Sequence, residues 1–378
     1  MIYCIIVREV GNMSETKHRT LTDALKAEIL SSKYSASRAI PSETQLSRKF
    51  KVSRTTVRKA LDALHHAGWI RSFRGRGTFV TRQGAARKIG LVVPGVSYSE
   101  FFPPIVDEIS RLTRESGYTL LLGNAVDRHP EDRARQTISF VRDFVADGVA
   151  GVIYQPIEMI ADAEKANRTA LTILDAAEAP VVIIDSDFTK SPRRSGYDIV
   201  GIDNLAAGMS VAEHLMSLGV TKIHFQSRPL CSTSVNDRRS GVIAAMSSSG
   251  TLARGFRDFK SDPDDTAALR AHLKRGRPEA FVCGNDTAAV RLKISLEKLG
   301  FRVPDDIRLV GFDDVKYAKI VTPQLTTVHQ PCEKIAEVAF HRLLARIADP
   351  SLQPCTISLP ADLVVRASSG QSMSPKKL

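Results

Sequence analysis

Cysteine is scarce in this sequence, and its distribution indicates neither disulfides nor a metal site. The five cysteines stand at positions 4, 231, 283, 332 and 355, and no two of them have the Cys-x-x-Cys spacing. An odd number without a regular pattern is typical of reduced thiols in a cytoplasmic protein. The adjacent histidines His65 and His66 would point in different directions on a helix. We therefore predict no metal ion and no other cofactor.

Long hydrophobic runs are also missing. No apolar stretch reaches the roughly 18 residues that a membrane-spanning helix needs, so no membrane partner is predicted. The apolar residues 1–7 are too few for a signal peptide, and no basic residue precedes them. Met13, which a polar segment follows, is an alternative start of the protein that would exclude residues 1–12.

Positive charge is in excess, but only in the first quarter of the chain. The whole sequence carries a net charge of +12. Residues 1–88 contain 18 lysines and arginines against 6 acidic residues, whereas residues 89–378 contain 35 of each sign. A basic module joined to a neutral body indicates a polyanionic partner, nucleic acid before a membrane surface. A basic face that is merely solvated would give the same charge. The pattern of residues therefore has to distinguish a nucleic-acid-binding surface from a solvated one.

The basic region has the periodicity of three short helices. Leu21, Leu25 and Ile29 mark an amphipathic helix over about 20–32. A second helix is predicted from a capping box, and a third follows after a two-residue turn. The residues that cap or end these helices are Ser42, Gln45, Ser53 and Gly68. Two short helices joined by so brief a turn indicate a helix-turn-helix.

The exposed face of the third helix and the segment after it suit DNA. The polar residues of its first two turns are Arg54, Thr55, Thr56, Arg58 and Lys59. In a helix-turn-helix this part of the second helix enters the major groove, where arginine can bind guanine. Residues 69–80 then alternate as a β-hairpin, with a Gly/Arg tip that could approach a minor groove.

This region resembles the GntR family of regulators. The matching segments are Pro41-Ser42-Glu43, Leu46, Val52–Arg58, Ala60-Leu61, Leu64, Gly68 and Arg74–Val80, within residues 19–82. The resemblance implies DNA contacts from the recognition helix and the wing. With the residues around them, the predicted DNA-binding set is Ser42, Ser53, Arg54, Thr55, Thr56, Arg58, Arg74, Gly75, Arg76 and Gly77. Thr44 departs from the family, which often has an arginine there, and is not included.

From residue 89 onward, short apolar segments alternate with amphipathic ones. The predicted strands are Ile89–Val93, Tyr118–Leu122, Gly151–Tyr154, Val181–Ile184, Ile199–Ile202, Ile223–Phe225, Ala280–Cys283 and Ile307–Gly311. The predicted helices are Phe102–Ser116, Glu131–Ala146, Leu205–Leu218, Arg238–Ser248 and Thr287–Leu299. This order predicts an α/β fold in two lobes, each a doubly wound parallel sheet. The polar segment 188–198 is the predicted first crossing between the lobes.

Polar residues follow many of these strands, at the edge where ligands of such folds bind. They are Ser97, Asn124, Gln155, Asp185, Asp203, Asn204, Asn285, Asp286, Asp313 and Asp314. Carboxylates and amides can bind vicinal hydroxyls, and the aromatic rings of Tyr98, Phe101 or Phe102 can stack on a sugar. Asp and Asn are also common helix caps, and we expect about half of these residues to be caps only.

The same region resembles the effector domain of the lactose/purine-repressor (LacI) family, which is similar to periplasmic sugar-binding proteins. The matching segments are 89–94, 148–153, Asp185, 200–204, 207–208, Arg238 before Gly241, 283–289, 303–307, 310–314 and 325–328, within 89–366. The resemblance implies ligand contacts at Arg238, Asn285 and Asp313. The full predicted effector set is Ser97, Tyr98, Phe102, Asn124, Asp185, Arg238, Asn285 and Asp313. Arg238 could instead pair with Asp203 or Asp313 as a structural residue; we favour the ligand role, because guanidinium groups also bind adjacent hydroxyls.

The main alternative is an enzyme on a doubly wound fold, such as a sugar dehydrogenase. It requires a glycine-rich phosphate loop after the first strand, whereas Val93 is followed by Pro94-Gly95-Val96-Ser97. An exported binding protein would need a secretion signal and would not carry a DNA-binding module. A pyridoxal-dependent fusion, known within the GntR family, would have an aminotransferase fold in its second half.

Together these features predict a cytoplasmic transcription regulator that is not an enzyme. We expect residues 19–82 to bind a DNA operator and 89–366 to bind a small-molecule effector, with a linker at 83–88 and tails at 1–18 and 367–378. The expected effector is a sugar that releases a repressor of carbohydrate-utilisation genes. A homodimer is expected because a two-fold dimer suits a pseudo-palindromic operator.

Overall fold

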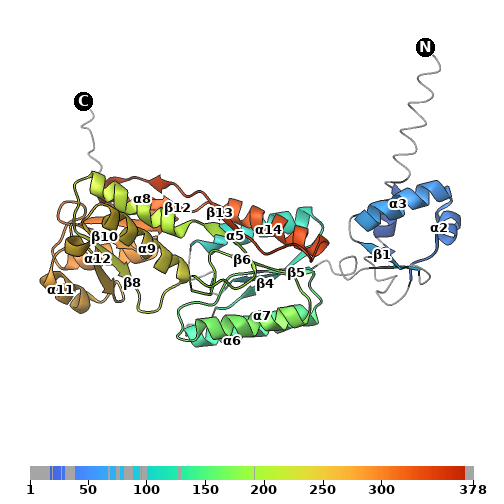
Figure 1. Cartoon of the computed structure of the whole chain (residues 1–378), viewed down its shortest axis with the longest axis horizontal. Coiled ribbons are helices and arrows are strands. Elements are labelled where there is room, and N and C mark those ends of the chain that lie inside the picture. The colour runs from blue at the N-terminus through green and yellow to red at the C-terminus, as the bar shows by residue number, and fades with distance from the viewer. Residues whose placement is uncertain are drawn as a thin grey trace, which may run out of the picture.

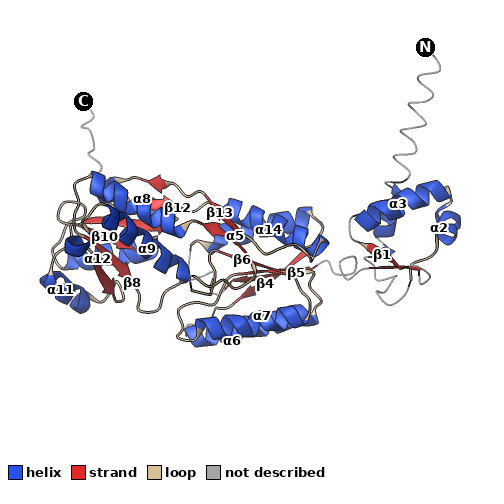
Figure 2. Cartoon of the chain, viewed as in Figure 1, coloured by secondary structure: helices blue, strands red, loops and turns tan. Residues whose placement is uncertain are grey.

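The computed structural model describes most of the chain as an N-terminal module and a larger α/β domain (Figures 1 and 2). The described residues are 18, 20–26, 28–29, 39–66, 69–73, 77–80, 88–93, 95, 100–126, 129–190 and 192–370. All structural statements below concern these residues.

The N-terminal module is built around one small apolar core. Residues 20–26 and 28–29 are helical. The elements after them are α2 (Glu43–Phe50), α3 (Arg54–His66), β1 (Ile70–Phe73) and β2 (Gly77–Val80). The buried side chains are Leu21, Leu25, Ile29, Ile40, Leu46, Val57, Ala60, Leu64, Ile70 and Val80. The apolar positions of the three predicted helices supply most of this core, as their spacing of three and four residues indicated.

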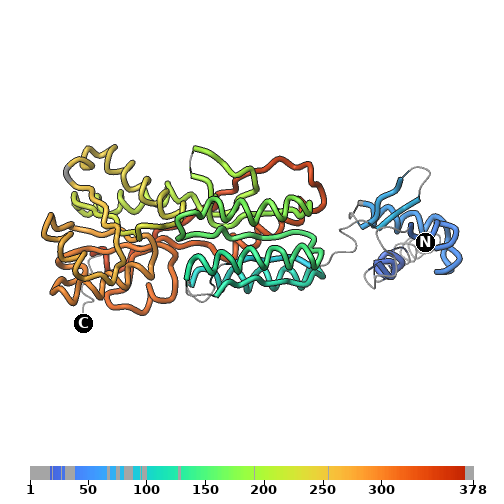
Figure 3. The backbone as a smooth tube through the Cα atoms, turned by 90° about the horizontal axis from the view of Figure 1, so that it is seen from below, coloured from blue at the N-terminus to red at the C-terminus, as the bar shows by residue number. Residues whose placement is uncertain are grey.

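The α/β domain contains two six-stranded sheets, one in each lobe. The course of the backbone through the two lobes can be followed in Figure 3. The first has the order β13-β7-β6-β5-β3-β4 and the second β14-β12-β11-β10-β8-β9. The strands of the first are β3 (Lys88–Val93), β4 (Thr119–Asn124), β5 (Gly151–Tyr154), β6 (Val181–Ile184), β7 (Asp198–Ile202) and β13 (Thr356–Leu359). Those of the second are β8 (Ile223–Ser227), β9 (Arg257–Lys260), β10 (Ala280–Cys283), β11 (Arg308–Asp313), β12 (Thr326–His329) and β14 (Leu363–Val364). Neighbouring strands are parallel except β12 and β14, which confirms the predicted fold class.

Helices cover both faces of the sheets. They are α5 (Phe102–Glu115), α6 (Pro130–Ala146), α7 (Ala163–Ala176), α8 (Asn204–Ser217), α9 (Thr233–Ser248), α10 (Leu252–Gly255), α11 (Thr266–Arg275), α12 (Asp286–Lys298), α13 (Lys316–Ile320) and α14 (Cys332–Ala348). In the first lobe α5 and α14 pack on one face, and α6 and α7 on the other (Figure 1). In the second lobe α8 packs along α9, while α11 and α12 pack together. Strands covered in this way are buried at every position, and β5, β6 and β10 are also largely apolar. The buried strand β8 also contains His224 and Gln226.

The prediction that residues 188–198 cross between the lobes was wrong. This segment joins β6 to β7, which pair directly in the first-lobe sheet. Its polar residues shape a local loop, in which the Asp187 carboxylate accepts hydrogen bonds from the backbone of Thr189 and of Ser195, both at 2.9 Å. The chain crosses instead after β7, after β12 and between β13 and β14. A polar segment marks a surface connection, and its composition does not say which sheet the next strand joins.

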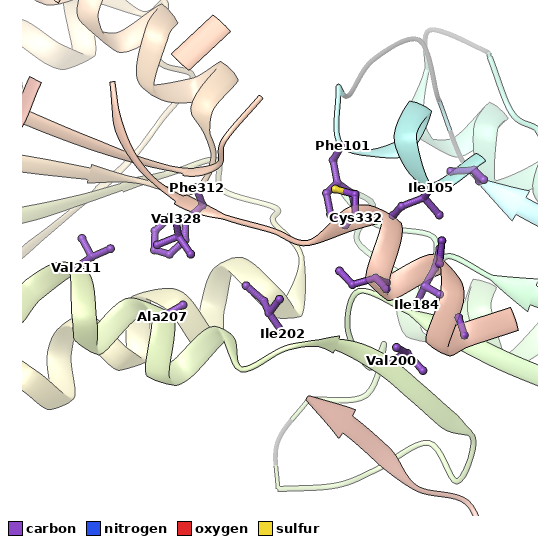
Figure 4. Packing of buried hydrophobic residues seen from close by; sticks show 14 of the residues in the cluster. Phe101, Ile105, Ile184, Val200, Ile202, Ala207, Val211, Phe312, Val328 and Cys332 are labelled. Carbon is purple, nitrogen blue, oxygen red and sulfur yellow. The ribbon is translucent and has the colours of Figure 1, made fainter. Parts of the chain in front are cut away.

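The crossing segments are anchored in a buried cluster that extends through both lobes. Figure 4 shows Phe312 and Val328 from the second lobe and Phe101 from the first, with Cys332 beside Phe101 and Ile202 between the two groups. Ile202 ends β7 and Cys332 begins α14, so both lie at crossings. Apolar packing therefore fixes the chain where it leaves one lobe and enters the other.

The sequence patterns missed several elements of the fold. These are the helices α7, α10, α11, α13 and α14 and the strands β9, β12, β13 and β14. Strands β9, β13 and β14 lie at sheet edges. β13 alternates between exposed and half-buried residues, and β9 is exposed at both of its ends, so neither contains an apolar run. The folded region also continues past Arg366, because the Ser368 hydroxyl donates to the Leu309 carbonyl at 2.6 Å.

Candidate functional site

The N-terminal turn of α3 presents the residues predicted to contact DNA. Ser53 caps this helix, since its hydroxyl accepts a hydrogen bond from the Thr56 backbone at 3.1 Å. Ser42 caps α2 with a complete capping box. Arg54 and Thr55 follow on the first turn of α3 and are exposed. The Ser42 and Ser53 caps fix the starts of α2 and α3 without using the side chains of Arg54 and Thr55, which remain available to a ligand.

Arg58 lies one turn further along α3 and is paired with α2. Its Nη2 lies 3.1 Å from Oε2 of Glu43. The hydrogen bond to Glu43 raises the pKa of Arg58 above its usual value. The two side chains are 68% and 37% exposed. Because solvent already reaches both groups, Arg58 can exchange this carboxylate for a phosphate or a base without a burial step.

The wing is a two-stranded antiparallel hairpin. Ile70 pairs with Val80 and Phe73 with Gly77, which leaves three residues at the tip. Gly77 has a φ of +102°, a backbone conformation that favours glycine. Arg74, Gly75 and Arg76, which were predicted to contact DNA, lie outside the described residues.

In the α/β domain, polar side chains of both lobes meet at the carboxyl ends of the strands. Gln155 follows β5, Asp185 follows β6, and Asp313 ends β11. The hydroxyl of Ser234, in the first turn of α9, lies 3.3 Å from Oδ2 of Asp185 and donates to it across the lobes. Asp185 and Asp313 have φ values of 74° and 112°. Non-glycine residues in this region are strained, and such strain concentrates at ligand sites.

Arg238 of α9 lies at the centre of this group and is only 3% exposed. Its Nε donates to Oδ1 of Asn204 at 2.8 Å, and its Nη1 donates to the Gly284 carbonyl at 2.7 Å. Nη1 also lies 3.4 Å from Oδ1 of Asp313. The guanidinium carbon is 4.7 Å from the centre of the Phe312 ring. Among the described residues no hydrogen bond uses Nη2, so one side of the guanidinium is left for a further partner.

Of the two structural partners considered for Arg238, the structure selects Asp313. Asp203 instead caps α8, where its Oδ1 accepts from the Ala206 backbone at 2.9 Å. Close helix packing holds Arg238 in place: a Cβ on Gly208 of α8 would lie 2.0 Å from the Arg238 carbonyl oxygen. A Cβ on Gly241 would lie 2.0 Å from the Leu205 carbonyl oxygen. Glycines at these two positions therefore let α8 and α9 approach closely enough to position the guanidinium.

Burial raises the pKa values of the carboxyl groups around Arg238. The pKa of Asp313 is raised by burial to about 6, although Arg238 and Gln330 favour its charged form. The pKa of Asp185 is also raised by burial, against the opposing charge of Arg238. For Glu158, burial and the negative charge of Asp185 raise the pKa well above its usual value. The site thus has an excess of acidic groups over its one guanidinium.

Two buried amide oxygens at this site have no hydrogen-bond partner among the described residues. They belong to Gln155, which is 1% exposed, and Gln330, which is 3% exposed. The amide nitrogen of Gln330 donates to Asp313 at 2.7 Å, so its oxygen is turned away from that carboxylate. Leaving a buried acceptor unsatisfied costs about 1–3 kcal/mol. A ligand with hydrogen-bond donors would remove this cost, which identifies the space between the lobes as the candidate binding cleft.

Further contacts join the lobes on either side of this network. The Thr233 hydroxyl donates to the Ser186 hydroxyl at 2.9 Å and also to the Asp187 carbonyl. Nζ of Lys316 lies 2.9 Å from Oε2 of Glu100. These are the contacts that have to break if the lobes separate.

Other predicted effector residues have different places. Asn285 caps α12, where its Oδ1 accepts from the Ala288 backbone at 2.8 Å. Asp286, which is fully buried, accepts from the Thr327 hydroxyl at 2.6 Å and from the Val315 backbone at 3.0 Å. With Asp203 as well, three strand-end residues are thus helix caps or internal braces.

Phe102 and Asn124 lie on α5 and β4, and no hydrogen bond or ion pair between described residues joins either of them to Arg238, Asp185 or Asp313. Phe102 begins α5, and its ring packs edge-on against Phe101 with the ring centres 5.2 Å apart. Asn124 ends β4, the edge strand of the first-lobe sheet. Ser97 and Tyr98 lie outside the described residues.

The sequence reasoning did not single out Glu158, Ser234 or Gln330. Gln330 directly follows β12, a strand that the patterns missed, so the strand-end rule could not reach it. Ser234 stands in the first turn of α9, which was predicted to begin five residues later than it does. Glu158 lies in the loop after β5, three residues beyond Gln155, and nothing in its local pattern distinguishes it.

Two further features are absent from the described part of the chain. No three His, Cys, Asp or Glu side chains there are grouped so that they could hold a metal ion. No helix there has the length and apolarity required to span a membrane.

Comparison with known proteins assigns both parts of the chain. Residues 17–80 match the bacterial regulatory proteins of the gntR family, and residues 212–369 match the periplasmic binding protein-like domain. The arabinose metabolism transcriptional repressor of Geobacillus stearothermophilus is 28% identical over 368 residues, which cover 93% of this chain and 97% of that protein. The transcriptional repressor PurR of Escherichia coli is 28% identical over 289 residues, covering 75% of this chain and 80% of PurR.

A solved structure of the transcriptional regulator CelR in complex with cellobiose has a similar fold, with a TM-score of 0.63 and 22% identity. The alignment covers 83% of this chain and 90% of that one. The parallel sheets, the helix-turn-helix and these relatives all indicate the same two-domain organisation. The chain therefore joins a GntR-type helix-turn-helix domain to a periplasmic-binding-protein-like domain and is a relative of LacI/PurR-type transcriptional repressors.

Proposed function

We propose that this chain represses carbohydrate-utilisation genes and is released from its operator by a sugar bound between the lobes. The observation that carries the proposal is the pair of buried amide oxygens on Gln155 and Gln330 that have no partner in the described part of the chain. They lie beside carboxylates and a guanidinium with a free nitrogen. Several hydrogen-bonding groups that converge in a cleft suit a polyhydroxyl ligand. The relative from Geobacillus stearothermophilus, named for arabinose metabolism, supports a carbohydrate role.

At the other end of the chain, we propose that the start of α3 reads the operator. The predicted contacts among the described residues are Ser42, Ser53, Arg54, Thr55, Thr56, Arg58 and Gly77. Arg54 is the proposed base reader, because it is exposed on the first turn and carries no ion pair with a described residue. Arg74, Gly75 and Arg76 complete the proposed set. We also propose a cytoplasmic homodimer that binds a pseudo-palindromic operator, since closed two-fold symmetry would place two such helices in successive major grooves.

Coupling between the two sites requires two states of the α/β domain. An effector can weaken DNA binding only if it favours a lobe arrangement that holds the two readers at the wrong spacing. We propose that the sugar stabilises the closed lobes, in which Ser234 and Thr233 contact the first lobe. The proposed coupling is about 1–3 kcal/mol, which is typical of allosteric regulators.

The test has two steps. An operator is first selected from random duplex DNA with the full-length protein, and its affinity is measured by fluorescence anisotropy. The protein is then heated with a panel of pentoses, hexoses and disaccharides. A sugar at 100 times its dissociation constant should stabilise the protein by roughly 2.7 kcal/mol, and the same sugar should lower operator affinity. Failure of every sugar to do either would reject the proposed function, whereas a sugar that tightens DNA binding would reverse only the sign of regulation.

A further inference from the structure

Among the residues that the structure describes, the cleft has more free hydrogen-bond acceptors than free donors. The acceptors without a described partner include the amide oxygens of Gln155 and Gln330. The carboxylate of Glu158 forms no hydrogen bond or ion pair with any described residue, and Oδ2 of Asp313 also accepts none from them. Against these, the network has a free donor nitrogen on Arg238. A ligand that fills this space must therefore bring donors of its own.

The charged groups of the cleft are also unequal in number, with more acidic than basic side chains. Glu158, Asp185 and Asp313 each interact electrostatically with the guanidinium of Arg238. Arg366 and Lys319 are paired with Asp314, while Lys260, which like Glu158 interacts electrostatically with Cys231, adds one further positive charge to this region. Three carboxyl groups against one guanidinium and one ammonium group still leave an excess of acidic groups where the ligand binds. Carboxylate or phosphate groups on a ligand would be repelled there, and a cationic group would be attracted.

The backbone at Glu158 is held in one position by α7. The Asn167 side chain, which is fully buried, accepts a hydrogen bond from the Ile157 backbone at 2.8 Å and donates to the Ile157 carbonyl at 2.9 Å. Tyr154 also donates to Asn167 at 2.8 Å. Met159, on the other side of Glu158, has a φ of 61°. The loop around Glu158 is thus ordered, while the half-buried Glu158 carboxylate has no partner among the described residues. This arrangement is typical of a preorganised ligand-binding residue.

From this geometry we infer that the effector is a cationic amino sugar, whose ammonium group binds Glu158 while its hydroxyls bind Asp185, Asp313 and the two free amide oxygens. The inference rests on the proposed effector site and names its ligand class. An ammonium group supplies three donors and one positive charge, which are the features that the cleft lacks. Before the ligand binds, the excess acidic groups can retain protons, because burial raises the pKa values of Glu158 and Asp185. An ammonium group would displace such a proton, so binding should release protons to the buffer.

The experiment compares sugars that differ at a single group. The full-length protein is titrated calorimetrically with glucosamine, galactosamine and mannosamine. Each amine is matched with its parent hexose and with its uncharged N-acetyl derivative. At least one amine should bind ten times more tightly than both of its neutral counterparts. Repeating that titration in two buffers of different ionisation enthalpy should reveal the proton release.

Two variants then test whether Glu158 causes the preference for the amino sugar over its neutral counterparts. The isosteric change Glu158→Gln removes the charge and keeps the side-chain shape, and it should reduce the tenfold preference for the amine to less than threefold. Glu131→Gln is the matched control, because Glu131 is exposed in the first turn of α6. This control should keep the full preference.

The outcomes separate this inference from the proposed function. A neutral hexose that binds as tightly as its amine and lowers operator affinity would overturn the amino-sugar inference and leave the proposed function standing. A preference for the amine that persists in Glu158→Gln would overturn the role of Glu158. If no amine, pentose, hexose or disaccharide binds, both the inference and the sugar-responsive function are rejected.

Discussion

Replacing Arg238 by alanine should destabilise the α/β domain as well as abolish the response to effector. The guanidinium compensates Asp313 and satisfies two further acceptors, the Gly284 carbonyl and the Asn204 side chain. Breaking a buried ion pair by removing one partner costs about 3–5 kcal/mol. The orphaned acceptors contribute to the same loss, so we expect the free energy of unfolding to fall by about 4 kcal/mol.

The size of this loss should depend on pH. Burial already raises the pKa of Asp313 to about 6, and Arg238 opposes that rise. Without Arg238 the pKa of Asp313 should rise further, because the opposing positive charge is gone. A carboxyl whose folded-state pKa lies above its unfolded value stabilises the fold least at high pH, where it has to ionise. The variant should therefore lose more stability at pH 8 than at pH 5.

Calorimetric unfolding of the full-length protein tests both statements. A loss of about 4 kcal/mol should lower the melting temperature by roughly 8–16 °C, at 2–4 °C per kcal/mol. Arg238→Lys keeps a charge but cannot donate from the same planar fork, so it should lie between the wild type and alanine. An unchanged melting temperature would refute the buried network. If Arg238→Ala still released its operator on addition of effector, at a temperature where it is folded, the role of Arg238 in ligand binding would be wrong.

Four further predictions follow from individual contacts. Arg54→Ala should weaken operator binding by roughly 1–3 kcal/mol and relax specificity at one base position; an unchanged footprint and base preference would reject this role. Effector affinity should fall about tenfold between pH 7 and pH 5, because the pKa of Asp313 is raised by burial to about 6 and ligand hydroxyls donate to its ionised form; a flat titration profile would argue against that contact. Gly208→Ala should lower the free energy of unfolding by roughly 1–3 kcal/mol and weaken the effector response, since its Cβ would lie 2.0 Å from the Arg238 carbonyl oxygen. A normal melting temperature and normal release of the operator would show that α8 and α9 can move apart without loss of stability. The fluorescence of Trp69, the only tryptophan of the chain, should respond to operator, while a large change caused by effector alone would mean that the two domains are in tight contact.

Local patterns were sufficient to predict the DNA-binding module. The helices α2 and α3 each begin at a cap of their own, as the Ser42 capping box and the Ser53 cap show. Its core residues recur at helical spacing within single segments, so no long-range information is needed to find them. The fully buried strands β5 and β6 were predictable for a similar reason, since these parallel strands between helix layers are buried at every position and largely apolar.

Part of the cleft was also predictable, because parallel strands bring their carboxyl ends to one edge of a sheet. Asp185 and Asp313 were selected by that rule. Arg238 came instead from the resemblance to known regulators, since an arginine within a helix has no local feature that marks it as buried. Asn285 satisfied the strand-end rule too, yet its side chain caps α12. Local sequence cannot separate a cap from a ligand contact, because both place the same residue type at the same position.

The sequence by itself determined the basic helix-turn-helix, the α/β class and the strand ends where a ligand would bind. Only the tertiary structure decided that Arg238 pairs with Asp313 rather than Asp203, and that Glu158 and Gln330 join the same cleft. It also decided where the chain crosses between the lobes. The physical reason is that helices and strands form from preferences within a few neighbouring residues, whereas the cleft depends on residues far apart in the sequence, such as Arg238 and Asp313, which are 75 positions apart. Burial then sets the charge, pairing and pKa of each group, and burial is a property of the folded chain alone.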